Sequence, residues 1–303
     1  MQNRPLRPNQ TRRNRPGLWS LSLLIVPLGI AVAATPARVE KTMVFHTSPN
    51  PRISLSNLSG QVVVRGWDKP QVRALCSTAS PRVMIDAEPM PATGAADKVH
   101  FMTHLLDPML TGQDEIADYT LDVPLESSLE IRNRQGSVQI EKLMGEAWVE
   151  SVGGTITVTD VAGHLAVRSV GGDIEVIRCS GRVEASSITG NLHFVSLAGS
   201  ELHGNTTSGK VIYEGDFVSG GRYVLSEYSG DMEVFCPSSS SFELDAKSVR
   251  GKVITDPELS LVPKRRTAYS PSGANSLFGT HNSGNATVEL TSFSGNIHIR
   301  RQP

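Results

Sequence analysis

The sequence predicts an all-β protein, a β-solenoid or β-roll built from two-strand repeats of about 18 residues behind a signal peptide. Three observations carry this prediction: glycines recur at nearly constant steps, an alternating strand pattern follows each glycine, and a short polar residue precedes it. The composition agrees, because 27 glycines and only 5% aromatic residues are typical of a turn-rich β protein rather than a helical bundle.

The glycines set the period of the repeat. The tetrapeptide SVGG begins at Ser151 and again at Ser169, 18 residues later. From Gly136 to Gly251 the steps between equivalent glycines are 18, 18, 18, 19, 21 and 21 residues. The full series is Gly60, Gly136, Gly154, Gly172, Gly190, Gly209, Gly230, Gly251 and Gly295. We expect each glycine to occupy a turn and to adopt φ values that other residues resist.

Each glycine is followed by alternating apolar and polar residues. After Gly154, for example, Ile156 and Val158 are apolar whereas Thr155 and Thr157 are polar. Such alternation indicates a strand with one buried and one exposed face. A weaker glycine series lies midway between the members of the first, at Gly145, Gly163, Gly181 and Gly199. One repeat unit is therefore expected to hold two short strands and two turns.

The residue three positions before each glycine is short and polar in eight of nine cases. These positions, here called the polar turn column, are Asn57, Asn133, Ser151, Ser169, Ser187, Thr206, Glu227, Ser248 and Ser292. Short polar side chains hydrogen-bond nearby backbone in turns. Recurrence of the same residue types at the same offsets favours stacked units that bury apolar faces against one another. The spacing alone leaves open an antiparallel sandwich with turns about every nine residues.

We expect a single domain at residues 38–303. Within it, residues 128–256 are expected to form the stack, and residues 286–300 to close it after an excursion. Two insertions break the pattern. Residues 87–117 are interpreted as a loop with one strand near Lys98–His104, and residues 257–285 as an irregular segment rich in Pro, Ser, Gly and Asn.

Residues 1–37 have the features of a signal peptide and a short leader. Five arginines and no acid precede Leu18–Ala34, a run of 17 uncharged and mostly apolar residues. The sequence AVAATPA then offers small residues for cleavage after Ala33 or a few residues later. The alternative is an uncleaved anchor, although 17 residues that include a proline and a glycine are marginal for crossing a bilayer.

The net charge of the chain without its signal peptide gives no indication of nucleic-acid binding. Removing residues 1–33 takes away five of the 29 basic residues and none of the 30 acidic ones, which leaves a net charge of about −6. Nucleic-acid binding would require a basic face.

The three cysteines, Cys76, Cys179 and Cys236, leave at least one thiol unpaired. Three strand spacings, about 14 Å in total, would separate Cys179 from Cys236, too far for a disulfide, so small buried hydrophobes are the preferred interpretation.

Three stretches resemble the bacterial putative-adhesin family: LSNLSGQVVVRGWDKPQVRA, YTLDVPLESSLEIRNRQGSVQIEKLMGEAWVESVGGTITV and TVELTSFSGNIHIRR. The resemblance covers about residues 40–302 and consists of glycines and alternating strands rather than an active-site motif. Members of that family are exported repeated-β-strand proteins, long catalogued as a domain of unknown function. The resemblance implies a cell-envelope or surface protein and offers no catalytic residue to carry over.

Histidines and carboxylates offer two weak candidates for chemistry. His100 and His104 are four residues apart, but no glutamate accompanies them as in the HExxH zinc motif, so surface histidines are the preferred interpretation. Asp173 and Glu175 lie two apart on an outward face, but the neighbouring units supply no acidic column around them. We expect no catalytic, cofactor-binding or metal-ligating residue, and no cofactor.

Aromatic and basic residues suggest binding surfaces instead. Trp148 is expected to point outward and could stack on a sugar ring, and Trp67 is the weaker platform. The cluster PKRR, Pro263–Arg266, is either a solvated loop or a contact for an anionic envelope polymer.

The sequence therefore predicts an exported, non-enzymatic cell-envelope protein. It would be an adhesin-like or scaffold module that presents polar side chains to a glycan or an envelope protein. One alternative is an envelope-stress or signalling accessory that binds a membrane partner, with residues 18–34 kept as an anchor. The other is a polysaccharide-processing enzyme that depends on Asp173 or Glu175. The expected location is the periplasm, the outer membrane or the cell surface.

Overall fold

The computed structural model describes residues 38–107, 109, 111–263 and 275–302, which belong to one compact unit that begins at Pro36. Within these ranges the chain forms β-strands and one short 3-10 helix, η1 (Gly112–Glu115), so the prediction of an all-β fold is confirmed. The predicted signal peptide at residues 1–37 lies outside the described residues. No helix in the described part of the chain is long and apolar enough to span a membrane.

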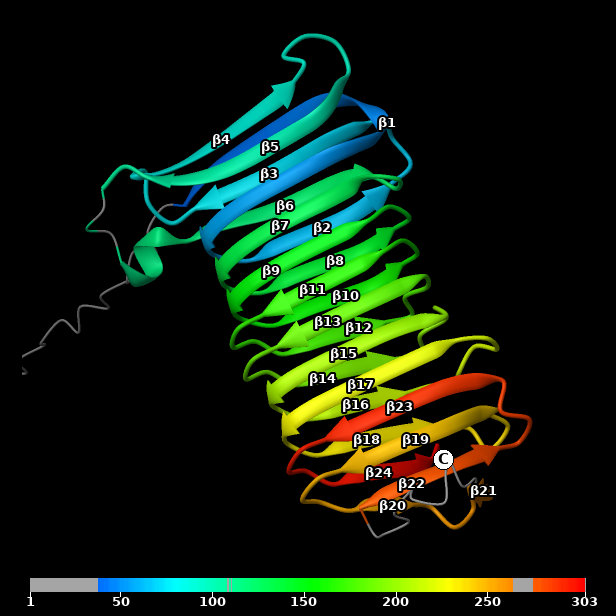
Figure 1. Ribbon diagram of the computed structural model, residues 1–303. Helices are drawn as coiled ribbons and strands as arrows, with labels where there is room; N and C mark the ends of the chain where they lie inside the picture. The colour runs from blue at the N-terminus through cyan, green and yellow to red at the C-terminus, as the bar shows by residue number, and fades with distance from the viewer. Residues whose placement is uncertain (1–37, 108, 110, 264–274, 303) are drawn as a thin grey trace, which may run out of the picture. The chain divides into compact units, whose positions relative to one another are not determined.

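The strands form two sheets, here called sheet A and sheet B (Figure 1). Sheet A contains, in spatial order, part of β1 (Val39–Ser59), β3 (Gln71–Thr78), β6 (Ala117–Pro124), β2 (Val62–Trp67), β8 (Val138–Leu143), β10 (Ile156–Val161), β12 (Ile174–Ile177), β14 (Leu192–Val195), β16 (Val211–Glu214), β18 (Met232–Cys236), β24 (Ile297–Arg301) and β20 (Val253–Thr255). Sheet B contains β4 (Val83–Met90), β5 (Ala96–Leu105), the rest of β1, β7 (Ser128–Gln135), β9 (Ala147–Gly153), β11 (Leu165–Ser169), β13 (Arg182–Ser187), β15 (Glu201–Ser208), β17 (Arg222–Ser229), β23 (Ala286–Ser292), β19 (Phe242–Ser248), β22 (Ser276–His281) and β21 (Leu261–Pro263). Because β1 belongs to both sheets, the described strands form one continuous hydrogen-bonded network.

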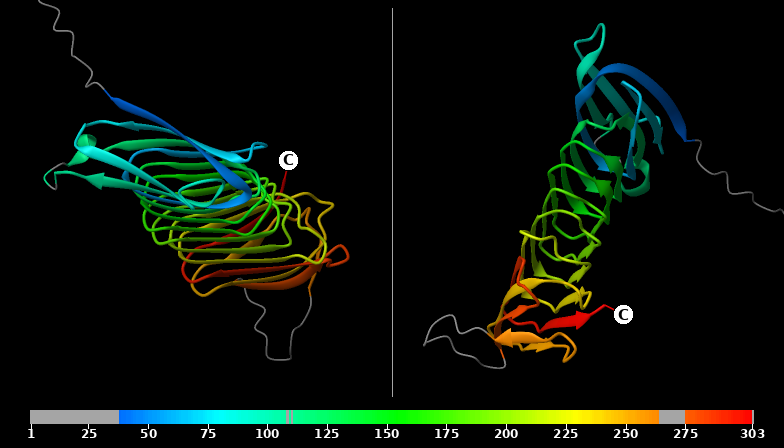
Figure 2. Two further views of the ribbon diagram at one scale, coloured as in Figure 1. Left: turned by 90° about the horizontal axis from the view of Figure 1, so that it is seen from above. Right: turned by 90° about the vertical axis from the view of Figure 1, so that its right-hand side faces the viewer.

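From β7 to β18 the chain alternates between the two sheets, and each strand pairs in parallel with the strand two positions later. In sheet A, Ile156 lies opposite Ile174, which lies opposite Leu192. In sheet B, Val149 lies opposite Val167. Each repeat unit, here called a coil, thus returns to the same place one strand spacing further along, about 4.8 Å. Seen from above, the coils overlap as flattened loops (Figure 2).

The alternating side chains fill the space between the sheets, as predicted. Ile156, Val158 and Phe194 are fully buried, and each such side chain contributes about 1.5–3 kcal/mol relative to remaining exposed. In β20, an edge strand of sheet A, Val253 and Thr255 are only half-buried. The apolar core is therefore continuous along the stack and thins at that edge.

The recurring glycines lie against one another because their turns stack. A Cβ atom on Gly154 would lie 2.3 Å from the carbonyl oxygen of Gly136, and one on Gly172 would lie 1.9 Å from that of Gly154. Our expectation that each glycine supplies an unusual φ is wrong for Gly172, whose φ is outside the left-handed region, although Gly136 and Gly154 have φ of 108° and 98°. Close approach of successive turns is the constraint that all three share.

The two segments expected to interrupt the repeat both contain strands. In residues 87–117, β5 pairs in parallel with β1 and extends sheet B, and β4 folds back on β5 as an antiparallel hairpin. The expected strand near Lys98–His104 is therefore confirmed as β5, and β4 adds a strand that was not expected at the start of the segment. In the described part of residues 257–285, β22 pairs antiparallel with β19, and β21 pairs with β22.

The last two strands do not close the stack. β23 lies between β17 and β19, and β24 lies between β18 and β20 (Figure 1). Residues 286–301 thus form a coil inserted between two coils that are earlier in the sequence. The expectation that residues 286–300 end the stack is wrong because their strands pair on both sides.

Candidate functional site

The outer face of sheet B presents its side chains in columns. Because the strands pair in parallel and in register, outward side chains of successive coils lie beside one another. The first outward column contains Glu130, Trp148, Ala166, Glu184, His203 and Val224. The second contains Arg132, Glu150, Arg168, Ser186, Asn205 and Ser226.

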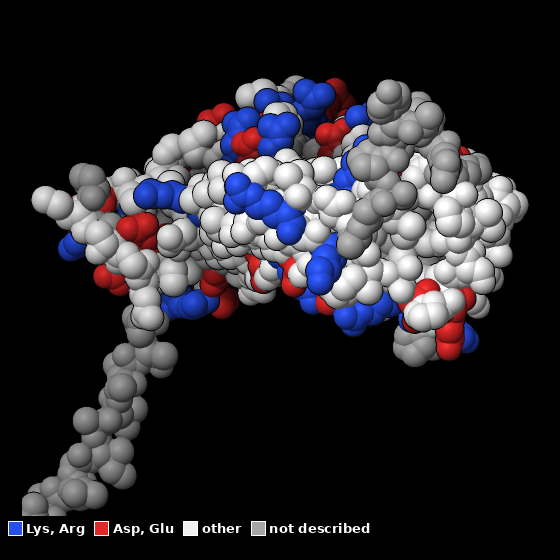
Figure 3. Space-filling view, turned by 60° about the horizontal axis from the view of Figure 1, so that its bottom comes forward, with Lys and Arg blue, Asp and Glu red and all other residues white. Residues whose placement is uncertain are grey.

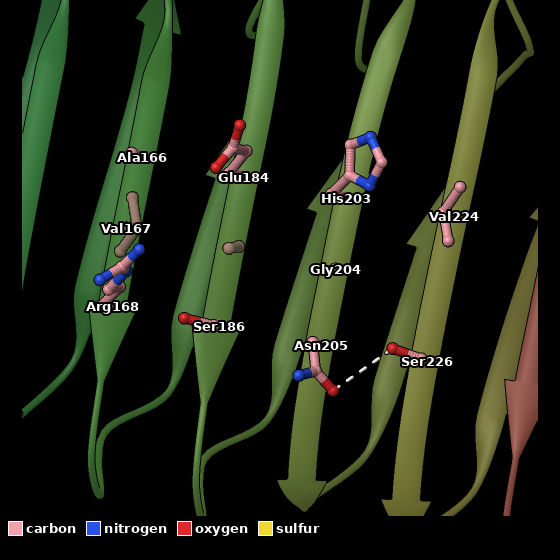
Figure 4. A pocket seen from close by; sticks show the side chains of 11 residues that line it. Ala166, Val167, Arg168, Glu184, Ser186, His203, Gly204, Asn205, Val224 and Ser226 are labelled. Carbon is pink, nitrogen blue, oxygen red and sulfur yellow. Dashed lines mark hydrogen bonds between the residues drawn. The ribbon is translucent and has the colours of Figure 1, made fainter.

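A hollow of about 240 Å³ lies across these columns between β11 and β17, and is here called the central hollow. Its floor is low because Ala166 and Ser186 are short. Figure 4 shows Arg168, Glu184 and His203 projecting around it from three neighbouring strands. The remaining lining residues are Val167, Ala185, Gly204, Asn205, Val224 and Ser226. A hollow built from strand residues is held rigidly by the ladder of backbone hydrogen bonds.

The polar groups of the central hollow offer both donors and acceptors. Ser226 donates from Oγ to Asn205 Oδ1 at 3.3 Å, which leaves the Asn205 amide nitrogen available. Partial burial is the largest influence on Glu184 and raises its pKa, but the hydrogen bond from Arg182 at 2.7 Å, the charge of Arg182 and the nearby His164 together outweigh it, so the pKa of Glu184 is lowered. Glu184 is therefore a carboxylate at neutral pH. Such a mixture suits a ligand rich in hydroxyl groups.

Trp148 lies at the margin of this hollow. It occupies the same column as Ala166 on the adjacent strand, and 42% of its surface is exposed, so its predicted outward orientation is confirmed. Trp67 is occupied differently: its Nε1 donates to the carbonyl oxygen of Gln71 at 2.8 Å, and Lys69 and Arg73 lie over its ring. Trp148 is thus the better-placed aromatic surface of the two.

The candidate histidines are each bound to a separate neighbour. His100 Nδ1 lies 2.6 Å from Ser54 Oγ, and His104 Nε2 lies 3.3 Å from an Asp86 carboxylate oxygen. Across the residues that the structure describes, no three His, Cys, Asp or Glu side chains are grouped to hold a metal ion.

The candidate carboxylates also serve different neighbours. Asp173 Oδ1 accepts a hydrogen bond from the backbone nitrogen of Asn191 in the next coil at 2.8 Å. Glu175 lies 3.6 Å from His193, which lies 3.2 Å from Glu214. These contacts join adjacent coils on the outer side of sheet A.

The three cysteines are free and fully buried, as expected for small hydrophobes. Burial raises the pKa of the Cys76 and Cys236 thiols to about 12 and that of Cys179 to about 11. They are therefore unreactive thiols at neutral pH. Of the predicted basic cluster PKRR, residues 264–266 lie outside the described residues.

The sequence reasoning missed His203 and Asn205 because neither belongs to a motif. Their signal is positional: positions 148, 166 and 184 follow the 18-residue period, and the 19-residue step from Gly190 to Gly209 brings position 203 into line with them. Aligning outward as well as inward positions would have identified the columns. Charges give less guidance, because Figure 3 shows basic and acidic side chains interspersed on the visible face, with broad uncharged areas between them.

No protein-family model matches this chain, and no curated protein matches it. Among solved structures, it is similar to a "putative cell adhesion protein" from Clostridium sporogenes, with 11% sequence identity and a TM-score of 0.31. That likeness covers 88% of this chain and 100% of the other. A likeness this distant carries no functional assignment, so the function must be argued from the geometry.

Proposed function

We propose that this protein is a β-solenoid that acts outside the cytoplasm as a non-enzymatic, adhesin-like or scaffold module of a bacterial cell envelope. The observation that carries the proposal is the outer face of sheet B, where in-register coils present polar columns and a central hollow beside Trp148. A ligand that extends along these columns would make many weak contacts at once, and their summed affinity could be high without a deep pocket.

The ligand class proposed for the face is an envelope glycan or an envelope protein. Donors and acceptors such as His203 and Asn205 suit hydroxyl groups, and Trp148 offers a stacking surface for a sugar ring. An enzymatic function is less well supported, because the two candidate catalytic carboxylates, Asp173 and Glu175, each contact a residue of a neighbouring coil.

Co-sedimentation of purified residues 38–303 with envelope fractions tests the proposal. The fractions would be used with and without prior protease treatment. Retention that survives protease indicates a glycan or lipid ligand, and retention lost after protease indicates a protein partner. Absence of retention from both fractions would contradict an envelope-binding role.

Two variants test whether retention by the envelope fractions depends on the outer face of sheet B. Replacing both Trp148 and Asn205 by Ala should reduce retention severalfold, because both side chains project from the outer face of sheet B. The matched control replaces Thr157 and His298, two outward residues of sheet A, by Ala, and should retain binding. Equal losses in both variants would locate the binding surface elsewhere.

A further inference from the structure

A second hollow on sheet B, here called the apolar groove, spans β1, β5, β7, β9 and β11. It encloses about 610 Å³. Leu58, Met102, Val152 and Val170 form its apolar floor. Val152 is 52% exposed and Val170 is 45% exposed, so the floor is open to solvent along the groove.

The apolar floor is part of a third outward column on sheet B. Val152 and Val170 occupy equivalent positions, two residues before the recurring glycines of their coils, and Ile188 continues the column with 51% of its surface exposed. On the other side of Val152, the column continues with Arg134. The middle of the same sheet face is polar. Soluble proteins rarely expose contiguous apolar side chains without a binding role. The column therefore points to a partner surface rather than to a solvated edge.

The walls of the groove carry excess positive charge. Arg132, Arg134 and Arg168 line it, against one acid, Glu150, among the described lining residues. Arg132 is engaged by Glu130 at 2.9 Å and by Glu150 at 3.5 Å. Within the described part of the chain, neither Arg134 nor Arg168 makes an ion pair. Two exposed guanidinium groups therefore remain available to an incoming anion.

The spacing of these two arginines is set by the stack. Arg134 lies on β7 and Arg168 on β11, two coils further along and two residues earlier along the strand. Two strand spacings and a two-residue offset place their Cα atoms roughly 12 Å apart. The exposed floor residues Val152 and Val170 lie in the coils of β9 and β11. A ligand that contacts both arginines must therefore carry two negative groups about 12 Å apart with apolar groups near them.

We propose that the apolar groove binds an acidic peptide segment of a partner protein, with carboxylates on Arg134 and Arg168 and aliphatic side chains on Val152 and Val170. Guanidinium groups bind carboxylates in a bidentate manner, and arginine around an apolar centre is typical of protein interfaces. A lipid chain fits less well, because an open floor would leave much of the chain in water. The proposal deepens the proposed binding function by naming a partner class, and rests on it only in that sheet B is the binding face.

Fluorescence anisotropy with a defined probe tests this assignment on the purified protein. The probe is the labelled peptide GELVLELG, whose two glutamates are four residues apart and therefore project from the same face of an extended chain, about 13 Å apart. The matched probe GQLVLQLG removes both charges. We expect saturable binding of the acidic probe, at least tenfold weaker binding of the amide probe, and at least a tenfold loss in the double variant Arg134→Gln, Arg168→Gln.

Two further variants test the apolar floor and provide a control. Val152→Ser with Val170→Ser should weaken the acidic probe about tenfold by removing the apolar floor. The control variant Arg222→Gln with Val249→Ser changes one exposed arginine and one exposed valine elsewhere on sheet B and should bind normally. Unchanged affinity in the arginine double variant, or no saturable binding of the acidic probe, overturns the proposal.

Competitors separate the other ligand classes. Polygalacturonate, or vesicles of phosphatidylglycerol, that bind in an Arg134- and Arg168-dependent manner while the acidic peptide does not would overturn the peptide assignment. If the acidic peptide does not bind but the arginine double variant still co-sediments with envelope fractions, the groove proposal is contradicted. The proposed envelope-binding function is then still supported.

Discussion

The central coils and the coil of β17 fill the same turn position differently. In the central coils, Ser169 and Ser187 accept hydrogen bonds from the backbone nitrogens of Gly172 and Gly190, each at 2.8 Å. At the C-terminal end, the equivalent residue of β17 is Glu227, which is 4% exposed. Neither of its carboxyl oxygens has a hydrogen-bond partner in the described structure. The same turn bond is made at Ser248 and Ser292 of the C-terminal coils, whose Oγ atoms accept from the backbone nitrogens of Gly251 and Gly295 at 2.8 and 2.9 Å. The turn position is thus satisfied at these serines and unsatisfied at Glu227.

The difference coincides with a change in how the coils follow one another. Central coils stack in sequence order, whereas Glu227 faces Ser292 of the inserted strand β23. Ser292 directs its hydroxyl to the carbonyl oxygen of Gly295 at 3.0 Å, in its own coil. The junction between β17 and the inserted coil therefore carries an unpaired buried carboxyl, whereas at the junction with β19 the Ser248 hydroxyl donates to the carbonyl oxygen of Gly295 at 2.7 Å.

Truncation after Asn285 should have the largest effect, and only at the C-terminal end. It removes β23 and β24, which pair with coils on both sides. In stacked repeats, stability depends on contacts between neighbours, so β19 and β20 should lose amide protection while β9–β14 keep theirs. Hydrogen exchange measured by mass spectrometry reports both regions. Uniform loss of protection would contradict the comparison, because it would show that the coils unfold as one unit.

Gly172→Ala should destabilise the central coils strongly. The added methyl group would lie 1.9 Å from the carbonyl oxygen of Gly154, so the stacked turns must separate, at a cost of about 3 kcal/mol. Gly153→Ala is the matched control, since a Cβ there meets no atom within 4 Å. Urea unfolding compares the two variants. Equal midpoints would show that turn stacking does not limit the side chain at position 172.

Glu227→Gln should stabilise the C-terminal coils in a pH-dependent manner. Burial raises the pKa of Glu227, and the nearby Asp231 carboxylate adds to the shift. A raised folded-state pKa means that wild-type stability is highest below the ordinary Glu value of about 4.3 and is lost as pH rises through the folded-state value. At neutral pH the variant should therefore be more stable by about 1–3 kcal/mol.

Melting temperatures from pH 3.5 to 8 check this expectation. The gap between the variant and the wild type should be small at the acidic end and should widen as pH rises. Glu40→Gln, at an exposed position of β1, is the control and should show no widening gap. A constant gap across the pH range would mean that the Glu227 charge is not the cause.

The smallest effect is expected at the corners of sheet A in the central coils. Positive φ values of 58°, 57°, 51° and 51° recur there at Lys142, Asp160, Arg178 and Ser196. Glycine adopts this region freely, so Lys142→Gly should raise the unfolding free energy by about 0.5–1 kcal/mol after its own entropy cost. Thr157→Gly, inside strand β10, should instead lower it by a similar amount. A loss in both variants would show that the corner is not strained.

Only part of the candidate site was predictable from the sequence. The outward position of Trp148 was predictable, since it depends on counting residues along one strand. The central hollow was not, because it needs Ala166, Glu184 and His203 from three strands to lie side by side. Which arginines of the apolar groove lack an ion-pair partner was not predictable either, because the pairing of Arg132 and Arg168 depends on neighbours in other coils.

By itself, the sequence determined the period of the repeat and the buried positions, such as Ile156 and Val158, because alternation along a strand is a local property of the backbone. It also marked the turns, where glycine is required by close stacking. Only the tertiary structure decided that residues 286–301 insert between earlier coils, and that Glu227 meets Ser292. Equivalent repeat units offer nearly the same edge to any strand, so the order of pairing is decided by long-range contacts that local sequence patterns do not encode.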